Sequence, residues 1–174
     1  MVILRRAKCY RRIKRPYTRK SKFNKQSFVK AIPQLKIIRF TMGDQRKSRP
    51  YKVSLISLQD IQLRQNSIES ARVFVNKHLH DSLGLNYFFR ILIYPHHVLR
   101  ENRMLTGAGS DRMQRGMQKA FGTPVGIASQ VKKGQSIFDL NLEEKDIPIG
   151  RLLFKKVTAR LAGKYSVNVK KIIF

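Results

Sequence analysis

Residues 66–94 read NSIESARVFVNKHLHDSLGLNYFFRILIY and carry the two strongest secondary-structure signals in the chain. Four apolar residues recur at helical spacing: Ile68, Ala71, Val75 and Leu79. This stripe predicts a helix over Ser67–Leu83, capped by Asn66 or Ser67 and stopped by Gly84. Aromatic and β-branched residues then predict a buried strand over Tyr87–Tyr94.

Outward from this stretch, alternating apolar residues and turn signals predict further strands over 35–40, 51–56, 97–100, 125–131, 136–142 and 165–169. A Gly43-Asp44 turn separates the first two strands, and a turn over 132–135 joins two later ones. A second helix is predicted to start at Asp146-Ile147-Pro148 and end at Gly163. Its expected buried stripe is Ile149, Leu152, Leu153, Val157 and Leu161.

Strands and two helices without regular βαβ alternation predict an α+β fold, with a mixed or antiparallel sheet packed against the helices. The length of 174 residues suits one domain with a real core. We expect an extended basic arm over 1–34 and a single core domain over 35–174. We expect a long loop rich in basic residues and glycine to protrude from this core over 102–116.

The arm is the most unusual part of the composition. Residues 1–43 contain fourteen lysines and arginines and no carboxylate, and the whole chain carries a formal net charge of +27. Cations crowded without anions repel one another and disfavour a compact state. A polyanion must therefore supply the negative charge, and the regularly spaced phosphates of a nucleic acid are its best match.

Aromatic residues are interleaved with the cations of the arm. Tyr10 and Tyr17 can stack on unpaired bases or pack the arm against the core, and the sequence leaves both roles open. Cys9 is the only cysteine, so a disulfide within the chain is impossible. We interpret it as a small side chain at a partner interface, with a reactive thiol as the alternative.

The segment 102–126 has no regular apolar pattern and contains five glycines. A long excursion of this kind inside a compact domain is usually functional, and one helical turn is expected near 113–120. Gly107-Ala108-Gly109-Ser110-Asp111-Arg112 lacks the third glycine of the dinucleotide motif and the Gly-Lys-Ser/Thr of the triphosphate loop. We therefore interpret the segment as a basic finger and not a small-nucleotide site; a solvated loop without a role is the alternative.

Catalytic and metal-binding patterns are weak. Glu101 and Asp111 are the only carboxylate pair near the finger, and we expect Glu101 to balance Arg100 and Arg103. The four histidines lack metal-ligand spacing. We predict no enzyme activity, no cofactor, no metal and no small-molecule substrate. No apolar run reaches the ~18 residues that span a bilayer, so we expect a soluble cytoplasmic protein.

Several short motifs occur together and in order. The most specific is Met104-Leu105-Thr106-Gly107-Ala108-Gly109-Ser110-Asp111-Arg112. Others are Cys9-Tyr10-Arg11, Pro16-Tyr17-Thr18-Arg19-Lys20, Glu69-Ser70-Ala71-Arg72, Tyr94-Pro95-His96 and Lys132-Lys133-Gly134-Gln135. In these motifs the chain resembles the large-subunit ribosomal protein family L-sixteen / L-ten-e, in its archaeal form.

The resemblance implies an α/β-hammerhead-like fold in the ribosome, bound to large-subunit ribosomal RNA near 5S ribosomal RNA and the peptidyl-transferase centre. It implies a non-catalytic protein that helps position tRNA in the A and P sites. Neighbouring ribosomal proteins are further partners, and subunit-assembly factors are candidates.

Two sets of candidate site residues follow. The candidate RNA contacts are Arg5, Arg6, Lys8, Tyr10, Arg11, Arg12, Lys14, Arg15, Tyr17, Arg19, Lys20, Lys22, His97, Arg100, Lys132 and Lys133. The resemblance adds a loop that faces tRNA, with Asn102, Arg103, Met104, Leu105, Gly107, Gly109, Asp111, Arg112 and Arg115.

Two rival functions stay open from the residues alone. A basic RNA-processing or RNA-modifying enzyme would need Glu101 or Asp111 for turnover. A DNA-architectural protein would bind generic duplex DNA, and Met104 and Leu105 would serve as its apolar wedges.

Overall fold

The computed structural model describes residues 5–13, 25, 28–102, 107–109, 116 and 121–172. Two α-helices are present in these ranges, α1 (Gln65–Leu83) and α3 (Ile147–Val157), with short 3-10 turns at Ala7–Tyr10 (η1), Glu144–Asp146 (η3) and Thr158–Arg160 (η4). The strands are β1 (Thr41–Gly43), β2 (Tyr51–Ser57), β3 (Ile61–Arg64), β4 (Phe88–Ile91), β5 (His97–Glu101), β6 (Thr123–Val131), β7 (Ser136–Leu142) and β8 (Tyr165–Lys171).

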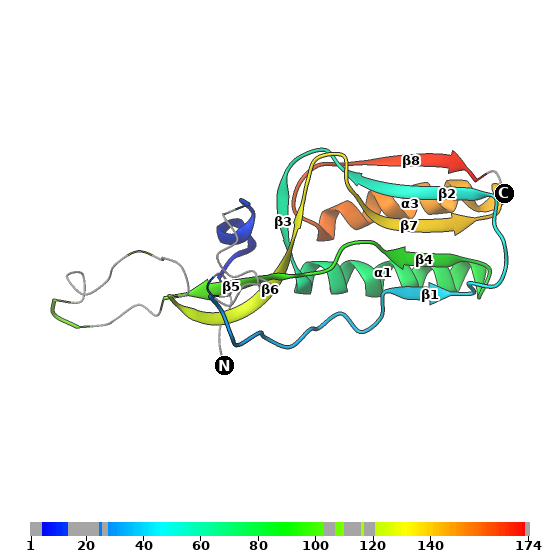
Figure 1. Cartoon of the computed structure of the whole chain (residues 1–174). Coiled ribbons are helices and arrows are strands. Elements are labelled where there is room, and N and C mark those ends of the chain that lie inside the picture. The colour runs from blue at the N-terminus through cyan, green and yellow to red at the C-terminus, as the bar shows by residue number, and fades with distance from the viewer. Residues whose placement is uncertain are drawn as a thin grey trace.

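These strands form two sheets. The larger has the order β1-β4-β7-β2-β8 and the smaller β3-β6-β5, and every pairing is antiparallel. Both helices lie against one face of the larger sheet, α3 behind β2 and β7 and α1 behind β4 and β1 (Figure 1). The predicted α+β class is confirmed, and the division into two sheets is a detail that the sequence did not predict.

The core fills the space between the larger sheet and the helices. The predicted apolar stripe of α1 is fully buried, and three aromatic rings, two from the sheet and one from α3, pack together. Phe89 and Phe138 meet edge to face with ring centroids 5.4 Å apart, and Phe154 of α3 lies 6.5 Å from each. Gly150 brings α3 close to the sheet, because a Cβ there would lie 2.7 Å from Leu142 Cδ1.

The opposite face of the larger sheet carries a charged cluster around Asp139. Asp139 is buried there, with Lys52 Nζ 2.6 Å and Arg90 Nη2 3.6 Å from its Oδ2. Ser54 Oγ donates to its other oxygen at 2.8 Å. Two cations thus share one carboxylate, so this face keeps an excess of positive charge.

Both predicted helices are present, with corrections at their ends and on one face. Helix α1 begins at Gln65 and its N-cap residue is Arg64, so the predicted caps Asn66 and Ser67 were wrong and lie inside the helix. The predicted stop at Gly84 is confirmed: its φ is +60°, and its main-chain N–H donates a hydrogen bond to the His80 carbonyl. Helix α3 ends at Val157, not at Gly163. Leu152 is exposed and was wrongly placed in the buried stripe, whereas Phe154 was missed.

Two predicted strands were wrong in extent. No strand covers 35–40: Lys36 N donates to Gln65 Oε1 at 2.8 Å, so this backbone is tied to the start of α1, and the strand begins at Thr41. The strand predicted over Tyr87–Tyr94 is only Phe88–Ile91, because Pro95 cannot continue a ladder and the chain leaves the sheet before it. Strand β3 was not predicted at all.

Candidate nucleic-acid interface

The smaller sheet brings the arm and the finger together. Strand β5 ends at Glu101, just before the finger, and strand β6 begins at Thr123, after it. The two strands therefore hold the two ends of the finger. The described segment 107–109 lies away from the body of the molecule, beyond the ends of these strands (Figure 1). Residues 5–13 of the arm lie beside the same sheet, with η1 against β3. The arm and the finger, which are about ninety residues apart in sequence, are thus both attached to the smaller sheet.

Tyr10 fixes the arm to this sheet. Its side chain is only 8% exposed and packs with Leu99 of β5 and Ala128 of β6. The Arg64 guanidinium carbon lies 5.7 Å from the centroid of the Tyr10 ring. Of the two roles left open for Tyr10, the structure shows packing, which leaves the ring inaccessible to a base.

Gln62 of β3 holds the backbone of the arm at two adjacent positions. The main-chain N–H of Gln62 donates to the Arg11 carbonyl at 2.9 Å, and its side-chain Nε2 donates to the Tyr10 carbonyl at 2.8 Å. Gln130 Nε2 lies 3.3 Å from Gln62 Oε1 and completes the network. Sequence reasoning missed Gln62 and Arg64 because it missed β3, although Ile61 and Leu63 give the alternation that marks a strand.

Replacing Gln62 with alanine should loosen the arm, because the Tyr10 carbonyl loses its donor in a buried site. We expect a loss of about 1–3 kcal/mol in the free energy of unfolding, and faster tryptic cleavage after Arg11 and Arg12. Urea unfolding and timed proteolysis measure the two effects. Gln59→Ala, at an exposed position, is the matched control. Equal cleavage rates in both variants would contradict the role of Gln62.

The described cations of the arm point to solvent. Arg5, Arg6, Lys8, Arg11 and Arg12 are all exposed. Within the described part of the chain, only Arg5 has a carboxylate partner, Glu101 Oε2 at 3.7 Å. Cys9 is exposed among them. At least four cations in a short span therefore present charge that the described residues do not neutralise.

Glu101 has a different partner from the one expected. Its side chain pairs with Arg5 of the arm, whereas Arg100 donates from Nη1 to the Phe121 carbonyl at 2.9 Å. That hydrogen bond links the end of strand β5 to the residues that lead into β6, and so closes the base of the finger. In the described part of the chain Glu101 thus pairs with Arg5 and not with Arg100, and the other expected partner, Arg103, lies outside the described residues.

His97 and Arg100 are partly buried at the root of the finger. Burial, and then the nearby charge of Arg100, lower the pKa of His97. Burial also lowers the pKa of Arg100, which nevertheless stays charged because its ordinary value is so high. A lowered pKa leaves the imidazole neutral at pH 7, so His97 adds no charge to the interface.

The turn at 132–135 is present as predicted, with Gly134 at φ +82°. Its backbone is fixed by two bonds, from Lys132 N to Gln135 Oε1 at 3.0 Å and from Lys133 N to Asp60 Oδ1 at 2.7 Å. The side chains of Lys132 and Lys133 are exposed. The hydrogen-bonded turn between β6 and β7 thus presents two exposed cations, Lys132 and Lys133, to solvent.

The remaining candidates divide into two groups. Asn102, Gly107 and Gly109 are described; Gly107 and Gly109 are exposed with positive φ, and a Cβ at either would meet nothing within 4 Å. The other candidates lie outside the described residues: Lys14, Arg15, Tyr17, Arg19, Lys20, Lys22, Arg103, Met104, Leu105, Asp111, Arg112 and Arg115. The helical turn expected near 113–120 lies there too, apart from Gly116.

In the described ranges no group of three or more His, Cys, Asp or Glu side chains could hold a metal ion. No helix there combines the length and the apolar character needed to cross a membrane.

Known proteins similar to this chain point to one family. The family model of ribosomal protein L16p/L10e matches residues 13–168. Large ribosomal subunit protein uL16 of Methanococcus aeolicus is 38% identical over 170 residues, which cover 97% of this chain and 95% of the relative. The uL16 proteins of Staphylothermus marinus and Archaeoglobus fulgidus are 37% and 33% identical, with 91% and 95% of this chain covered and 88% and 92% of the relatives.

This family match places the basic α+β chain in the class of structural, non-enzymatic ribosomal proteins. More particularly, the chain belongs to the L16p/L10e family, in its archaeal type. It is a constituent of the large ribosomal subunit, so its place in the cell is the ribosome and its partners are ribosomal RNA and ribosomal proteins.

Proposed function

We propose that this protein binds large-subunit ribosomal RNA near 5S ribosomal RNA and the peptidyl-transferase centre, and that its finger helps position tRNA in the A and P sites. The observation that carries the RNA-binding part is the set of four exposed arm cations, Arg6, Lys8, Arg11 and Arg12, which have no carboxylate partner among the described residues. Phosphate groups on several sides are the counterions that such an arm requires.

The arm also supports the finger. Tyr10 packs on Leu99 in β5, and Arg5 pairs with Glu101 at the end of the same strand. RNA that fixes the arm therefore fixes the strand from which the finger departs. In functional terms, residues 1–34 are the RNA-binding arm, and residues 35–174 are the core that carries the loop 102–116.

The finger suits close approach to a second RNA. Gly107 and Gly109 adopt positive φ, which glycine alone adopts without strain, and the space around their Cα atoms is open. A backbone without side chains at these two positions can approach a tRNA acceptor end closely. Arg103, Arg112 and Arg115 would supply the cations for its phosphates. Subunit-assembly factors are further candidate partners of this exposed segment.

Deleting residues 106–115 tests the division of labour between arm and finger. We expect the variant to enter large subunits at the normal level, because the arm and the core are intact, and to impair tRNA binding and peptide synthesis. Sedimentation and in vitro translation with tRNA-binding assays measure the two effects. The variant Arg112→Gln with Arg115→Gln keeps the length and tests charge separately. Normal translation with the deletion would show that the finger has no role in tRNA positioning.

A further inference from the structure

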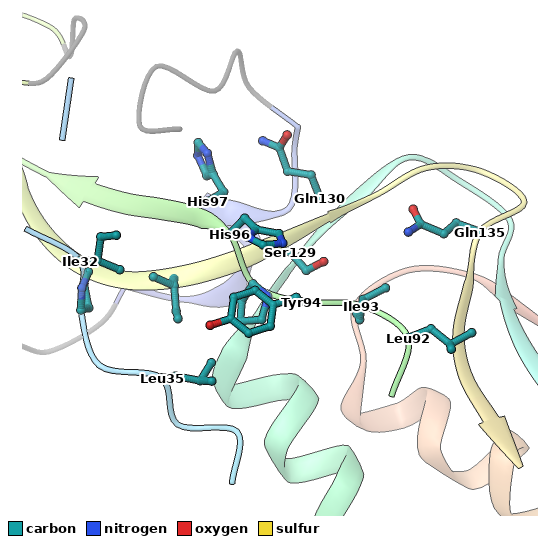
Figure 2. Close-up of a pocket in the computed structure, with 13 residues that line it drawn as sticks. Ile32, Leu35, Leu92, Ile93, Tyr94, His96, His97, Ser129, Gln130 and Gln135 are labelled. Carbon is teal, nitrogen blue, oxygen red and sulfur yellow. The ribbon is translucent and has the colours of Figure 1, made fainter. Parts of the chain in front are cut away.

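A groove of about 990 Å³ opens on the side of the molecule where the two sheets join. Thirteen residues line it (Figure 2), from the segment before β1, the connection between β4 and β5, the first residue of β5, and strand β6 with the turn that follows it. Figure 2 shows Tyr94 and His96 beside each other in the middle, with Ile32 and Leu35 on one side and Leu92 and Gln135 on the other. None of Arg5, Arg6, Lys8, Arg11 and Arg12 lines the groove, and neither does any described residue of 102–116.

Aromatic rings form a row along this groove. Phe40 and Tyr94 are stacked, with centroids 5.5 Å apart and planes 19° apart, and His96 lies 4.5 Å from Tyr94 at 44°. The His96 amide donates to the Tyr94 carbonyl at 3.0 Å, so a tight turn around Pro95 holds the two rings together. Tyr94 is 45% exposed and His96 is exposed as well. The row therefore ends in solvent, in a ring with no aromatic neighbour beyond it among the described residues.

Hydrogen-bonding groups stand near the rings. Ser129 is buried at the base of the groove, and Gln135 uses its Oε1 for the Lys132 amide, which leaves its NH₂ group to donate. Burial and the charge of Arg100 lower the pKa of His97, so that side chain is neutral at pH 7. None of the lining residues is an acid, whereas residues close in sequence are cationic: Lys30, Lys36, Arg39, Lys132 and Lys133.

We propose that this groove binds one unpaired nucleobase of ribosomal RNA, stacked on His96 at the end of the ring row. The inference rests on the proposed function and adds a site to it. A base requires a flat ring to stack on and a few donors and acceptors at its edge, and its backbone phosphates require cations at the rim. The groove has aromatic rings and amide groups inside, and lysines and an arginine stand within a few residues of its lining in sequence, which suits the base and the phosphates of a nucleotide. The volume also lies in the range of small-ligand sites.

Ultraviolet crosslinking of intact large subunits tests the site first. Residues 91–100 lie between Arg90 and Arg100 and so form one tryptic peptide, ILIYPHHVLR. We expect mass spectrometry to find this peptide with a single-nucleotide adduct. Adducts on arm peptides together with an unmodified 91–100 peptide would overturn the groove site alone, as would a crosslink from it to a neighbouring protein. A protein absent from the subunits would overturn the proposed function itself, and the groove site with it.

The crosslinked nucleotide then gives a second readout, its reactivity toward base-modifying reagents in assembled subunits. Removing one stacking ring should raise that reactivity by about tenfold in His96→Ala. His96→Phe keeps a ring and should restore protection. His80→Ala removes an exposed histidine from α1 and is the matched control. Equal reactivity in His96→Ala and His80→Ala would overturn the proposal.

Discussion

Replacing Arg6, Lys8, Arg11 and Arg12 together with glutamine should lower affinity for deproteinised large-subunit RNA by roughly a thousandfold at 0.1 M salt. The slope of log affinity against log salt should fall in magnitude by about three to four, because each phosphate contact contributes about 0.7–0.9. These four side chains are exposed and have no carboxylate partner in the described part of the chain. Filter binding over a salt series measures affinity and slope in one experiment.

A charge-matched control separates local contact from net charge. Arg46, Lys47, Lys77 and Lys145 are also exposed, and they lie outside the arm; Lys145 pairs with Glu143 at 2.9 Å. Their replacement with glutamine changes the net charge equally and should change the slope by less than about one. Equal slopes for the two quadruple variants would show that the arm acts only through overall charge.

Phe138→Ala should lower the free energy of unfolding by about 3–5 kcal/mol, the range for aromatic truncation in a packed core. Phe138 is fully buried and touches the rings of Phe89 and Phe154, so it joins β7 to β4 and to α3 at once. The substitution would leave a cavity between the sheet and α3. The backbone around it is held by hydrogen bonds, so it cannot collapse far to fill the space. A loss of this size is a large part of the ~5–15 kcal/mol that stabilises a typical domain.

Chemical unfolding of the isolated protein measures the effect, with Phe121→Ala as the control. The Phe121 side chain is 49% exposed, and it is the backbone carbonyl of Phe121 that accepts the hydrogen bond from Arg100. Its truncation should therefore cost less than about 1 kcal/mol. A similar loss in both variants would mean that the three-ring cluster is not the centre of the core.

Local patterns predicted the parts of the fold that depend on short-range physics. The stripe from Ile68 to Leu79 gave α1 because burial on one face of a helix requires that spacing, and Gly84 ended it because only glycine adopts its backbone conformation without strain. Strands β2 and β7 followed from alternation, and the turn at 132–135 from its glycine.

Long-range contacts decided what the sequence could not show. Segment 35–40 alternates like a strand, yet its backbone bonds to the Gln65 side chain, a partner some thirty residues away. Strand β3 is four residues long, so the alternation of Ile61 and Leu63 is a short signal, and its pairing with β6 is what completes the strand. The packing of Tyr10 under Arg64 depends on that same strand. The charge of the candidate interface was therefore predictable, and its attachment to the base of the finger was not.

A crosslinking map of ribosomes with bound tRNA tests most directly the claim that the arm holds RNA and the finger faces tRNA. Residues 104–112 form one tryptic peptide, MLTGAGSDR, which reports on the finger. The account predicts adducts of ribosomal RNA on peptides from residues 5–12 and adducts of the tRNA acceptor end on 104–112. An arm free of RNA adducts, with the finger crosslinked only to neighbouring proteins, would contradict it.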